Sequence, residues 1–304
     1  MNLPLLLNNI NINKVNTMDI KVKSNSSNIK TNIYPNKVFN KNDNTFKVNI
    51  LKYLFTSKLE RNFINSIKLI NKNKYKEAKE LLIDNKLKNN DIPDVEFLLA
   101  LLSDNPDERL QYLNNIINNL DDYCNLFYKY KVNIYVDIIV LDEIVVRITN
   151  DIDGLYFIAA KTMYDNGMID KAIDLISNTK NDNYFFKIIL GELFIQNNEY
   201  KKSVETLQDK NIDYTFMEKY FMLLMGITLR KLKLYHSSIE ILRKARRYTQ
   251  KTISSLILES KYQLGISLEA VGKETLARKE YESILIKNIS YKDINKRLKT
   301  LKIS

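Results

Sequence analysis

Two residue types that commonly perform nucleophilic or acid–base chemistry occur once each in this chain. Cys124 is the only cysteine and His236 is the only histidine, and they stand more than a hundred residues apart. Neither has an activating base or an orienting residue at a recognisable spacing. We therefore expect Cys124 to be a small buried thiol and His236 to be a partly exposed imidazole at the start of a helix. The sequence indicates no enzymatic activity.

Metal binding is equally poorly indicated. Asp151, Asp153 and Gly154 have the spacing of the middle of a calcium loop, but Thr149 stands at the first ligand position and Ala160 at the closing carboxylate position. The motif fails at both ends, and we interpret it as a turn and a helix cap. A single cysteine also excludes an intramolecular disulfide and a multi-cysteine metal site. We expect no metal and no other cofactor.

Positive charge is concentrated between residues 230 and 251. Seven cations follow Arg230 there, against Glu240 alone: Lys231, Lys233, Arg243, Lys244, Arg246, Arg247 and Lys251. Such a patch would attract a phosphate backbone, with binding that weakens steeply in salt. A solvated outer helix face explains the same charges, since the whole chain is rich in Lys and Asn, as an A+T-rich coding sequence would make it.

The bulk composition describes a chain that can bury a substantial core. It has 304 residues, of which 45% are hydrophobic, and a formal net charge of +11. The apolar run after Pro4 is too short for a secretory signal, and the apolar stretch Ile134–Ile148 is interrupted by charges. A single cysteine is typical of proteins in a reducing compartment. We expect a soluble, cytoplasmic protein.

The steps in composition predict three regions. Residues 1–50 are rich in asparagine with no sustained apolar period, so we expect a disordered arm. Residues 51–152 follow helical spacing and include degenerate repeat units. Residues 153–304 contain the regular repeats, followed by a capping helix that places Tyr291, Ile294, Leu298 and Leu301 on one face.

Between Ile92 and Asn150 the apolar spacing is helical but the repeat is lost. Pro93 and Pro106 stand where helices would begin, since a missing amide donor costs least in the first turn. The expected helices are Asp94–Leu102, Asp107–Asn118, Asp122–Lys131 and Ile134–Thr149. They would form two eroded hairpins of the same stack or a separate helical domain.

One spacing occurs three times between residues 184 and 284. Gly191, Gly226 and Gly265 are each followed, 12 and 16 residues later, by a small residue and then a large apolar one. Glycine inside a helix costs roughly 0.5–1 kcal/mol relative to alanine, so these positions need a packing reason. We expect each glycine to admit a second helix at close approach. The residues expected opposite them are Ser203 and Leu207, Ser238 and Leu242, and Ala277 and Tyr281.

Two further copies are less regular. Ala160 occupies the glycine position of a preceding unit, with Gly167 in the turn and Ala172 in the second helix. Ser66 takes the same position in a loose first unit, in which Ala78 is the small residue of the second helix.

These features resemble the tetratricopeptide repeat (TPR) family, whose helical hairpins pair a small residue in each helix at a period near 34. The small second-helix residues here, Ala172, Ser203, Ser238 and Ala277, follow one another at 31, 35 and 39 residues. The chain departs from the family pattern in having no Trp, no proline at unit ends, and Glu274 where an aromatic usually stands. The resemblance implies an all-α, right-handed superhelix, an α-solenoid of TPR-like hairpins.

In such hairpins the first helices line the concave side. Three positions of each first helix, together with Tyr220, would line a groove for a peptide or a partner helix: Phe157, Lys161, Tyr164, Ile188, Glu192, Ile195, Tyr220, Leu223, Ile227, Arg230, Tyr262, Ile266 and Glu269. Packing against adjacent repeats explains the apolar members equally well. The resemblance implies a protein-interaction scaffold with a protein or peptide partner; the alternative is an RNA-binding or other polyanion-binding repeat protein that uses the basic 230–251 surface. The sequence indicates no oligomeric state.

Overall fold

The computed structural model divides the chain into two units. The first contains residues 1–140 and 144–179, and the second contains residues 141–143 and 180–304. The residues it describes are 21–22, 56–88, 92–130, 132–140, 144–179, 184–208, 215–247 and 254–301. The predicted disordered arm lies outside these residues, apart from Lys21–Val22. The sequence placed a boundary at residue 152, whereas the division after residue 179 leaves the hairpin at 152–177 in the first unit.

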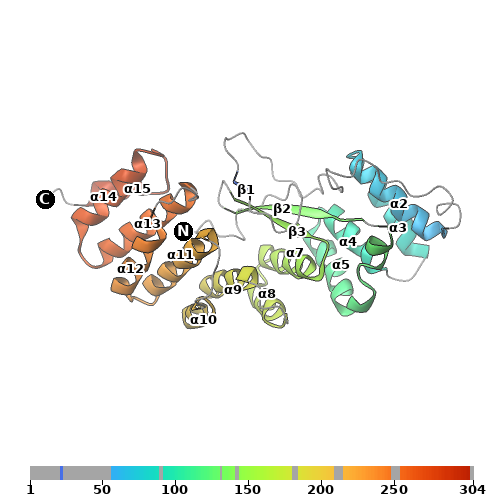
Figure 1. Cartoon of the computed structure of the whole chain (residues 1–304), viewed down its shortest axis with the longest axis horizontal. Helices are drawn as coiled ribbons and strands as arrows, with labels where there is room; N and C mark the ends of the chain where they lie inside the picture. Colours follow the sequence, from blue (N-terminus) through green and yellow to red (C-terminus); the bar gives the residue numbers. More distant parts are fainter. Residues whose placement is uncertain are drawn as a thin grey trace. The chain divides into compact units, whose positions relative to one another are not determined.

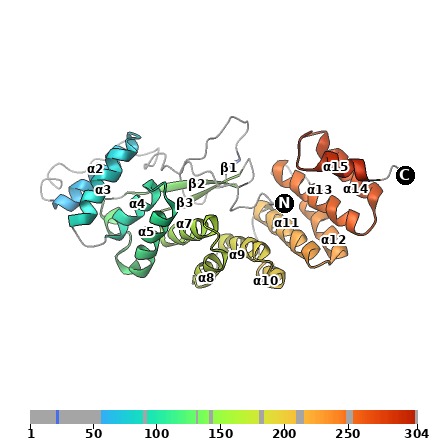
Figure 2. The same ribbon diagram turned by 180° about the vertical axis from the view of Figure 1, so that it is seen from behind.

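The described residues of the first unit form three helical hairpins, which can be followed in Figures 1 and 2. Ser57 and Glu60 form a capping box at the first helix, and Pro93 and Pro106 each stand at the start of a helix, as predicted. The hairpin helices are α2 (Lys58–Asn71) and α3 (Tyr75–Lys88), α4 (Pro93–Leu102) and α5 (Pro106–Asn118), and α7 (Ile152–Asp165) and α8 (Ile169–Ser177). The two helices of each hairpin pack on each other. Between hairpins, α3 packs on α4, and α5 packs on α7.

Aromatic side chains join the first two hairpins to a short helix, α6 (Asn125–Lys129). The Phe127 ring lies 5.6 Å from Phe63 and 6.0 Å from Phe97, centroid to centroid. Phe97 in turn lies 5.7 Å from Tyr123. All four side chains are buried, and they form the core of this part of the unit.

The predicted helix Ile134–Thr149 is wrong, because this stretch is a β-hairpin. Strands β2 (Tyr135–Val140) and β3 (Ile144–Thr149) pair antiparallel with Tyr135 opposite Thr149, and β1 (Lys21–Val22) pairs with β3 on its other side. Both strands are rich in Val and Ile, whose branched side chains are stiff in a helix and favour the pleated sheet.

The helix predicted at Asp122–Lys131 is also shorter than expected. It is replaced by a 3₁₀ turn, η1 (Leu120–Asp122), and α6. Cys124 separates them with φ +73°, a left-handed conformation that a continuous α-helix cannot contain.

The second unit repeats the hairpin three times and ends in a capping helix. First helices pack on second helices, α12 packs on α13, and α11 also packs on both α9 and α13 (Figure 1). The hairpins are α9 (Tyr184–Gln196) with α10 (Tyr200–Thr206), α11 (Thr215–Lys231) with α12 (Tyr235–Ala245), and α13 (Ser254–Ala270) with α14 (Glu274–Leu285). The capping helix, α15 (Ile294–Thr300), packs on α14 with Ile294 fully buried.

The three repeated glycines lie where the second helix approaches most closely. A Cβ on Gly226 would stand 2.5 Å from Cγ of Leu242, and one on Gly191 would stand 2.8 Å from a δ-carbon of Leu207. A Cβ on Gly265 would meet the Tyr281 ring in the same way. Real side chains do not approach this closely, so any larger residue would push the hairpin open. The predicted pairing is confirmed at all three hairpins.

Hydroxyl groups complete two of these contacts. Ser203 Oγ donates to the carbonyl of Gly191 at 3.0 Å, and Ser238 Oγ donates to the carbonyl of Gly226 at 2.7 Å. Ser238 Oγ also lies 3.0 Å from Oγ of Ser267, which belongs to the first helix of the next hairpin. Ser203 Oγ likewise lies 3.1 Å from Oγ1 of Thr228 on α11, so each of these two buried serines joins three helices and has its hydroxyl hydrogen-bonded.

Candidate functional site

The residues with catalytic side-chain types are not assembled into a reactive site. Cys124 is buried, its Sγ donates to the carbonyl of Asn150 at 3.0 Å, and burial raises the pKa of its thiol to about 12. It is therefore protonated at neutral pH and a poor nucleophile. His236 is exposed on α12. Within the described part of the chain, no three or more His, Cys, Asp and Glu side chains are grouped as metal ligands.

No helix among the described residues combines the length and the apolar character that crossing a membrane requires.

The apolar row of the predicted groove is buried. Phe157, Ile188, Leu223 and Tyr262 are 2%, 0%, 2% and 4% exposed. The burial of these four side chains fits packing against neighbouring helices better than it fits an open apolar groove. Phe157 belongs to the first unit with Lys161 and Tyr164, and the remaining groove residues belong to the second.

The outer positions of the predicted groove divide by exposure. Ile195 and Ile227 are buried, whereas Arg230, Ile266 and Glu269 are half-buried on α11 and α13. Lys161 and Tyr164 are half-buried on α7, where Lys161 forms an ion pair with Asp165. A partner could thus touch only a subset of the predicted residues directly.

A hydrogen bond between buried side chains joins the first helices α9 and α11. Glu192 and Tyr220 are both predicted groove residues, and they are 0% and 2% exposed. The Tyr220 hydroxyl donates to Oε1 of Glu192. This hydrogen bond between two buried side chains helps to fix the register of the two helices.

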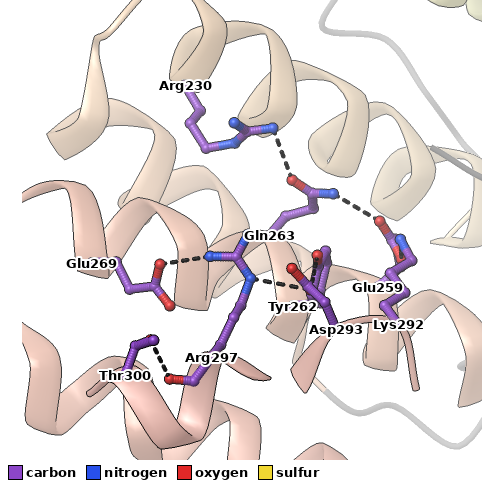
Figure 3. Close-up of polar contacts among 9 residues, drawn as sticks. All are labelled: Arg230, Glu259, Tyr262, Gln263, Glu269, Lys292, Asp293, Arg297 and Thr300. Atoms are coloured by element: carbon purple, nitrogen blue, oxygen red, sulfur yellow. Dashed lines mark hydrogen bonds and ion pairs between the residues drawn. The ribbon is translucent and has the colours of Figure 1, made fainter. Parts of the chain in front are cut away.

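A longer chain of polar contacts joins α11, α13 and the turn before α15 (Figure 3). Arg230 Nη2 donates to Oε1 of Gln263 at 3.1 Å, and Gln263 Nε2 donates to Oε1 of Glu259 at 2.8 Å. Glu259, which is 2% exposed, accepts from the Tyr291 hydroxyl at 2.6 Å and pairs with Lys292. The buried carboxylate is thereby surrounded by donors.

Arg297 of α15 makes the second set of contacts to α13 (Figure 3). Its Nη1 donates to Oε2 of Glu269 at 2.7 Å, and its Nε donates to Oδ1 of Asp293 at 3.1 Å. The Tyr262 hydroxyl donates to the same Asp293 oxygen at 2.6 Å. The Lys292 ammonium lies 4.6 Å from the centroid of the Tyr262 ring. The chain's own C-terminal segment therefore occupies the Tyr262 and Glu269 end of the predicted groove.

The pKa shifts in this network follow from burial and pairing. Burial lowers the pKa of Arg230, and burial together with the bond to Asp293 raises the pKa of Tyr262 to about 12. Burial alone would raise the pKa of Asp293, but the Tyr262 hydrogen bond and the Arg297 charge outweigh it and hold that pKa below its usual value. Asp293 and Arg297 are therefore a charged pair at neutral pH.

The basic residues between 230 and 251 differ in exposure. Lys231, Lys233, Arg243, Lys244 and Arg247 are exposed. Arg230 instead donates to Gln263, and half-buried Arg246 pairs with Glu280 at 2.9 Å. Lys251 lies outside the described residues. The structure thus offers no observation that favours the RNA-binding alternative.

Five residues of the polar network were missed from the sequence: Glu259, Gln263, Lys292, Asp293 and Arg297. They fall outside the repeated spacing, and the polar side of the capping helix was read as solvated. One signal was present, because Asp293 and Arg297 are four residues apart, a spacing at which opposite charges pair on one helix face.

No protein-family model matches the sequence. No curated protein sequence matches it either. Among solved structures, the N-terminal domain of the EccA1 ATPase from the ESX-1 secretion system of Mycobacterium tuberculosis is similar, with a TM-score of 0.58 at 9% identity over 81% of this chain and 90% of that chain. The apo form of the quorum sensor NprR from B. thuringiensis has a TM-score of 0.47 at 13% identity, over 83% of this chain and 72% of that one. A tetratricopeptide repeat protein from Parabacteroides merdae has a TM-score of 0.40 at 12% identity, over 79% and 97%.

At such low sequence identities, structural similarity is informative about the fold alone. Only the EccA1 domain, with a TM-score of 0.58, is similar enough among these three structures to support a comparison of folds. With the glycine-centred hairpins, it confirms the predicted TPR-like helical-repeat fold.

Proposed function

We propose that this chain is a non-enzymatic, cytoplasmic interaction scaffold that binds a peptide or a partner helix along the first helices of its repeats. The observation that supports this most directly is the set of polar links between those helices in the second unit. Tyr220 with Glu192, Arg230 with Gln263, and Arg297 with Glu269 hold α9, α11, α13 and α15 in register. A face that is already ordered loses less entropy when a partner docks, which favours binding.

The proposal gives the predicted groove residues two roles. In the second unit the half-buried members Arg230 and Ile266 would touch the partner, and Glu269 would hold α15 beside them through Arg297. The buried members would support the helices from beneath. Polar side chains around one accessible isoleucine suit a peptide that presents an apolar residue between polar ones.

The experiment that tests this places a photo-crosslinking amino acid at Ile266 in the full chain expressed in its native cell. A matched control carries the same group at Lys201, which is exposed on α10, a second helix. We expect a discrete crosslinked protein from position 266 and none from position 201. Equal products from both positions would contradict the assignment.

Substitutions of the buried row are unsuitable for this test. Leu223→Glu would place a charge at a side chain that is 2% exposed, and the loss of binding would then report unfolding.

A further inference from the structure

The turn between α14 and α15 carries two of the most exposed large apolar side chains of the described residues (Figure 1). Ile286 is 87% exposed and Ile289 is 71% exposed. Single exposed aliphatic residues are ordinary on protein surfaces, but two in one short turn form a feature that water solvates poorly.

The turn is anchored in a way that keeps these side chains outside. The carbonyl of Ile289 accepts from Nδ2 of Asn295 at 2.9 Å. Two residues further on, the Tyr291 hydroxyl is bonded to the buried Glu259 at 2.6 Å. At the α14 end of the turn, the amides of Lys287 and Asn288 both donate to the carbonyl of Ile284 at 2.9 Å. The backbone that carries the isoleucines therefore has little conformational freedom to lose on binding.

Cations surround this turn and the adjacent helices. Lys287 follows Ile286 directly, and its charge interacts with Lys261 of α13, whose Nζ donates to Ser283 Oγ at 2.9 Å. Burial, and then the charges of Lys287 and Arg246, lower the pKa of Lys261.

One carboxylate lies within this basic group. Glu280 pairs with Arg246 and also interacts with Lys261 and Arg243. Three cations, Arg246, Lys261 and Arg243, therefore act on the Glu280 carboxylate, and Lys287 adds a fourth positive charge beside Lys261.

We propose that Ile286 and Ile289, with Arg243, Arg246, Lys261 and Lys287, form a docking surface for a protein segment that carries both acidic and apolar side chains. The charge complementarity selects acidic groups, and the isoleucines select apolar ones. Arg243 and Arg246 belong to the end of α12, Lys261 to α13, and Ile286, Lys287 and Ile289 to the α14–α15 turn. This docking surface rests on the proposed scaffold function only in that the occupant is a protein.

Two other anionic partners fit the side chains less well. Proteins that bind single-stranded nucleic acids commonly stack bases on aromatic rings, and the exposed large apolar side chains of this turn are aliphatic. An anionic bilayer would meet Glu282, which is half exposed on the same helix, whereas a peptide can leave that position uncharged.

The test uses the purified full chain and a short fluorescent peptide made of Glu and Leu in an amphipathic helical pattern. Comparison probes replace Glu by Gln, replace Leu by Ser, or are single-stranded oligouridine or phosphatidylserine vesicles. We expect the Glu–Leu peptide to bind about tenfold more tightly than either altered peptide, because both classes of contact contribute. Binding of that peptide should weaken as salt is raised.

Variants of the full chain identify the surface. We expect Ile286→Ser with Ile289→Ser, and separately Lys261→Glu with Lys287→Glu, to weaken peptide binding about tenfold each. Leu276→Ser, at the opposite end of α14, and Lys201→Glu, on α10, are the matched controls and should leave it unchanged. Circular dichroism melts establish that each variant is folded.

Three results would overturn the proposal: no binding of the Glu–Leu peptide at millimolar concentration, binding that neither double variant weakens, or tighter binding of oligouridine or vesicles than of the peptide. Ile266→Ser, which tests the first-helix face, should leave this binding intact. Failure of this surface is therefore distinguishable from failure of the scaffold function.

Discussion

Five hairpins share one residue in the left-handed region, two positions before the second helix begins. These residues are Asn73, Gly167, Asn198, Lys233 and Gly272, with φ between +59° and +73°. Each lies in a turn closed by the same pair of backbone bonds. In the turn between α11 and α12, for example, the amides of Lys233 and Leu234 donate to the carbonyls of Arg230 and Leu229 at 2.9 Å each. Gly and Asn tolerate this conformation, whereas lysine is strained in it.

Replacing the strained lysine should therefore stabilise the protein. We expect Lys233→Gly to raise the free energy of unfolding by about 0.5–1 kcal/mol, since relief of left-handed strain exceeds the added entropy of the unfolded chain. Lys233→Ala keeps the Cβ and should give no comparable gain. Urea denaturation measures both, and a gain from Ala equal to that from Gly would show that strain is not the cause.

Asp94 makes stability depend on pH. Its carboxylate is fully buried, accepts from the Phe127 amide at 2.9 Å, and has its pKa raised by burial from 3.8 to about 6. Between these values the folded state binds more protons than the unfolded state, so stability is greatest below about pH 4 and falls as pH rises toward 6. A shift of this size corresponds to about 3 kcal/mol over that window.

The matched variant is Asp94→Asn, which keeps an acceptor for the Phe127 amide and removes the titration. Thermal unfolding of the wild type at several pH values should show this decline in stability, together with the effects of its other titrating groups. The difference in stability between the wild type and Asp94→Asn should change between pH 4 and 6. A difference in stability that stays constant with pH would contradict the claim that burial raises the pKa of Asp94.

At the scale of elements, prediction succeeded where one apolar face has a helical period. The helices α4 and α5 begin at Pro93 and Pro106, one residue before their predicted starts. The stretch Tyr135–Thr149 was misread because continuous apolar runs do not distinguish a buried helix from a strand by period alone. The abundance of Val and Ile was the better signal, and the register with β1 depends on residues far away in the sequence.

The capping helix is the element most dependent on polar contacts. Arg297→Met would remove the donors that Glu269 and Asp293 accept from, leaving carboxylates short of partners. We expect a loss of about 2–4 kcal/mol in local stability, seen as faster hydrogen exchange across α15 with α11 and α12 unchanged.

Lys296→Met is the control for this experiment, since Lys296 is exposed on the same helix. It should leave exchange in α15 as in the wild type. Equal acceleration by both variants would show that helix propensity or hydrophobicity, and not the ion pairs, determines how α15 docks.

At the scale of the whole molecule, the repeat spacing was enough to predict the fold but not the site. Helical spacing identifies which residues share a face, and Gly191, Gly226 and Gly265 needed no other information. Which groove residues stay accessible depends on how neighbouring hairpins and the C-terminal segment pack. For that reason Tyr262 was predicted as part of an open row, whereas in the structure it is buried beside Asp293 and Lys292.

Variants of the contact between Gly226 and Leu242 test this account most directly. Every hairpin of the second unit has the same close contact between a glycine of the first helix and a large side chain of the second. In urea denaturation, Gly226→Ala should cost about 1–3 kcal/mol and Leu242→Ala about 2–5 kcal/mol. The double variant should be at least about 1 kcal/mol more stable than their sum, as the new methyl group fills the space that the leucine leaves. Additive effects, or a stabilising Gly226→Ala as expected for an open helix face, would contradict the account.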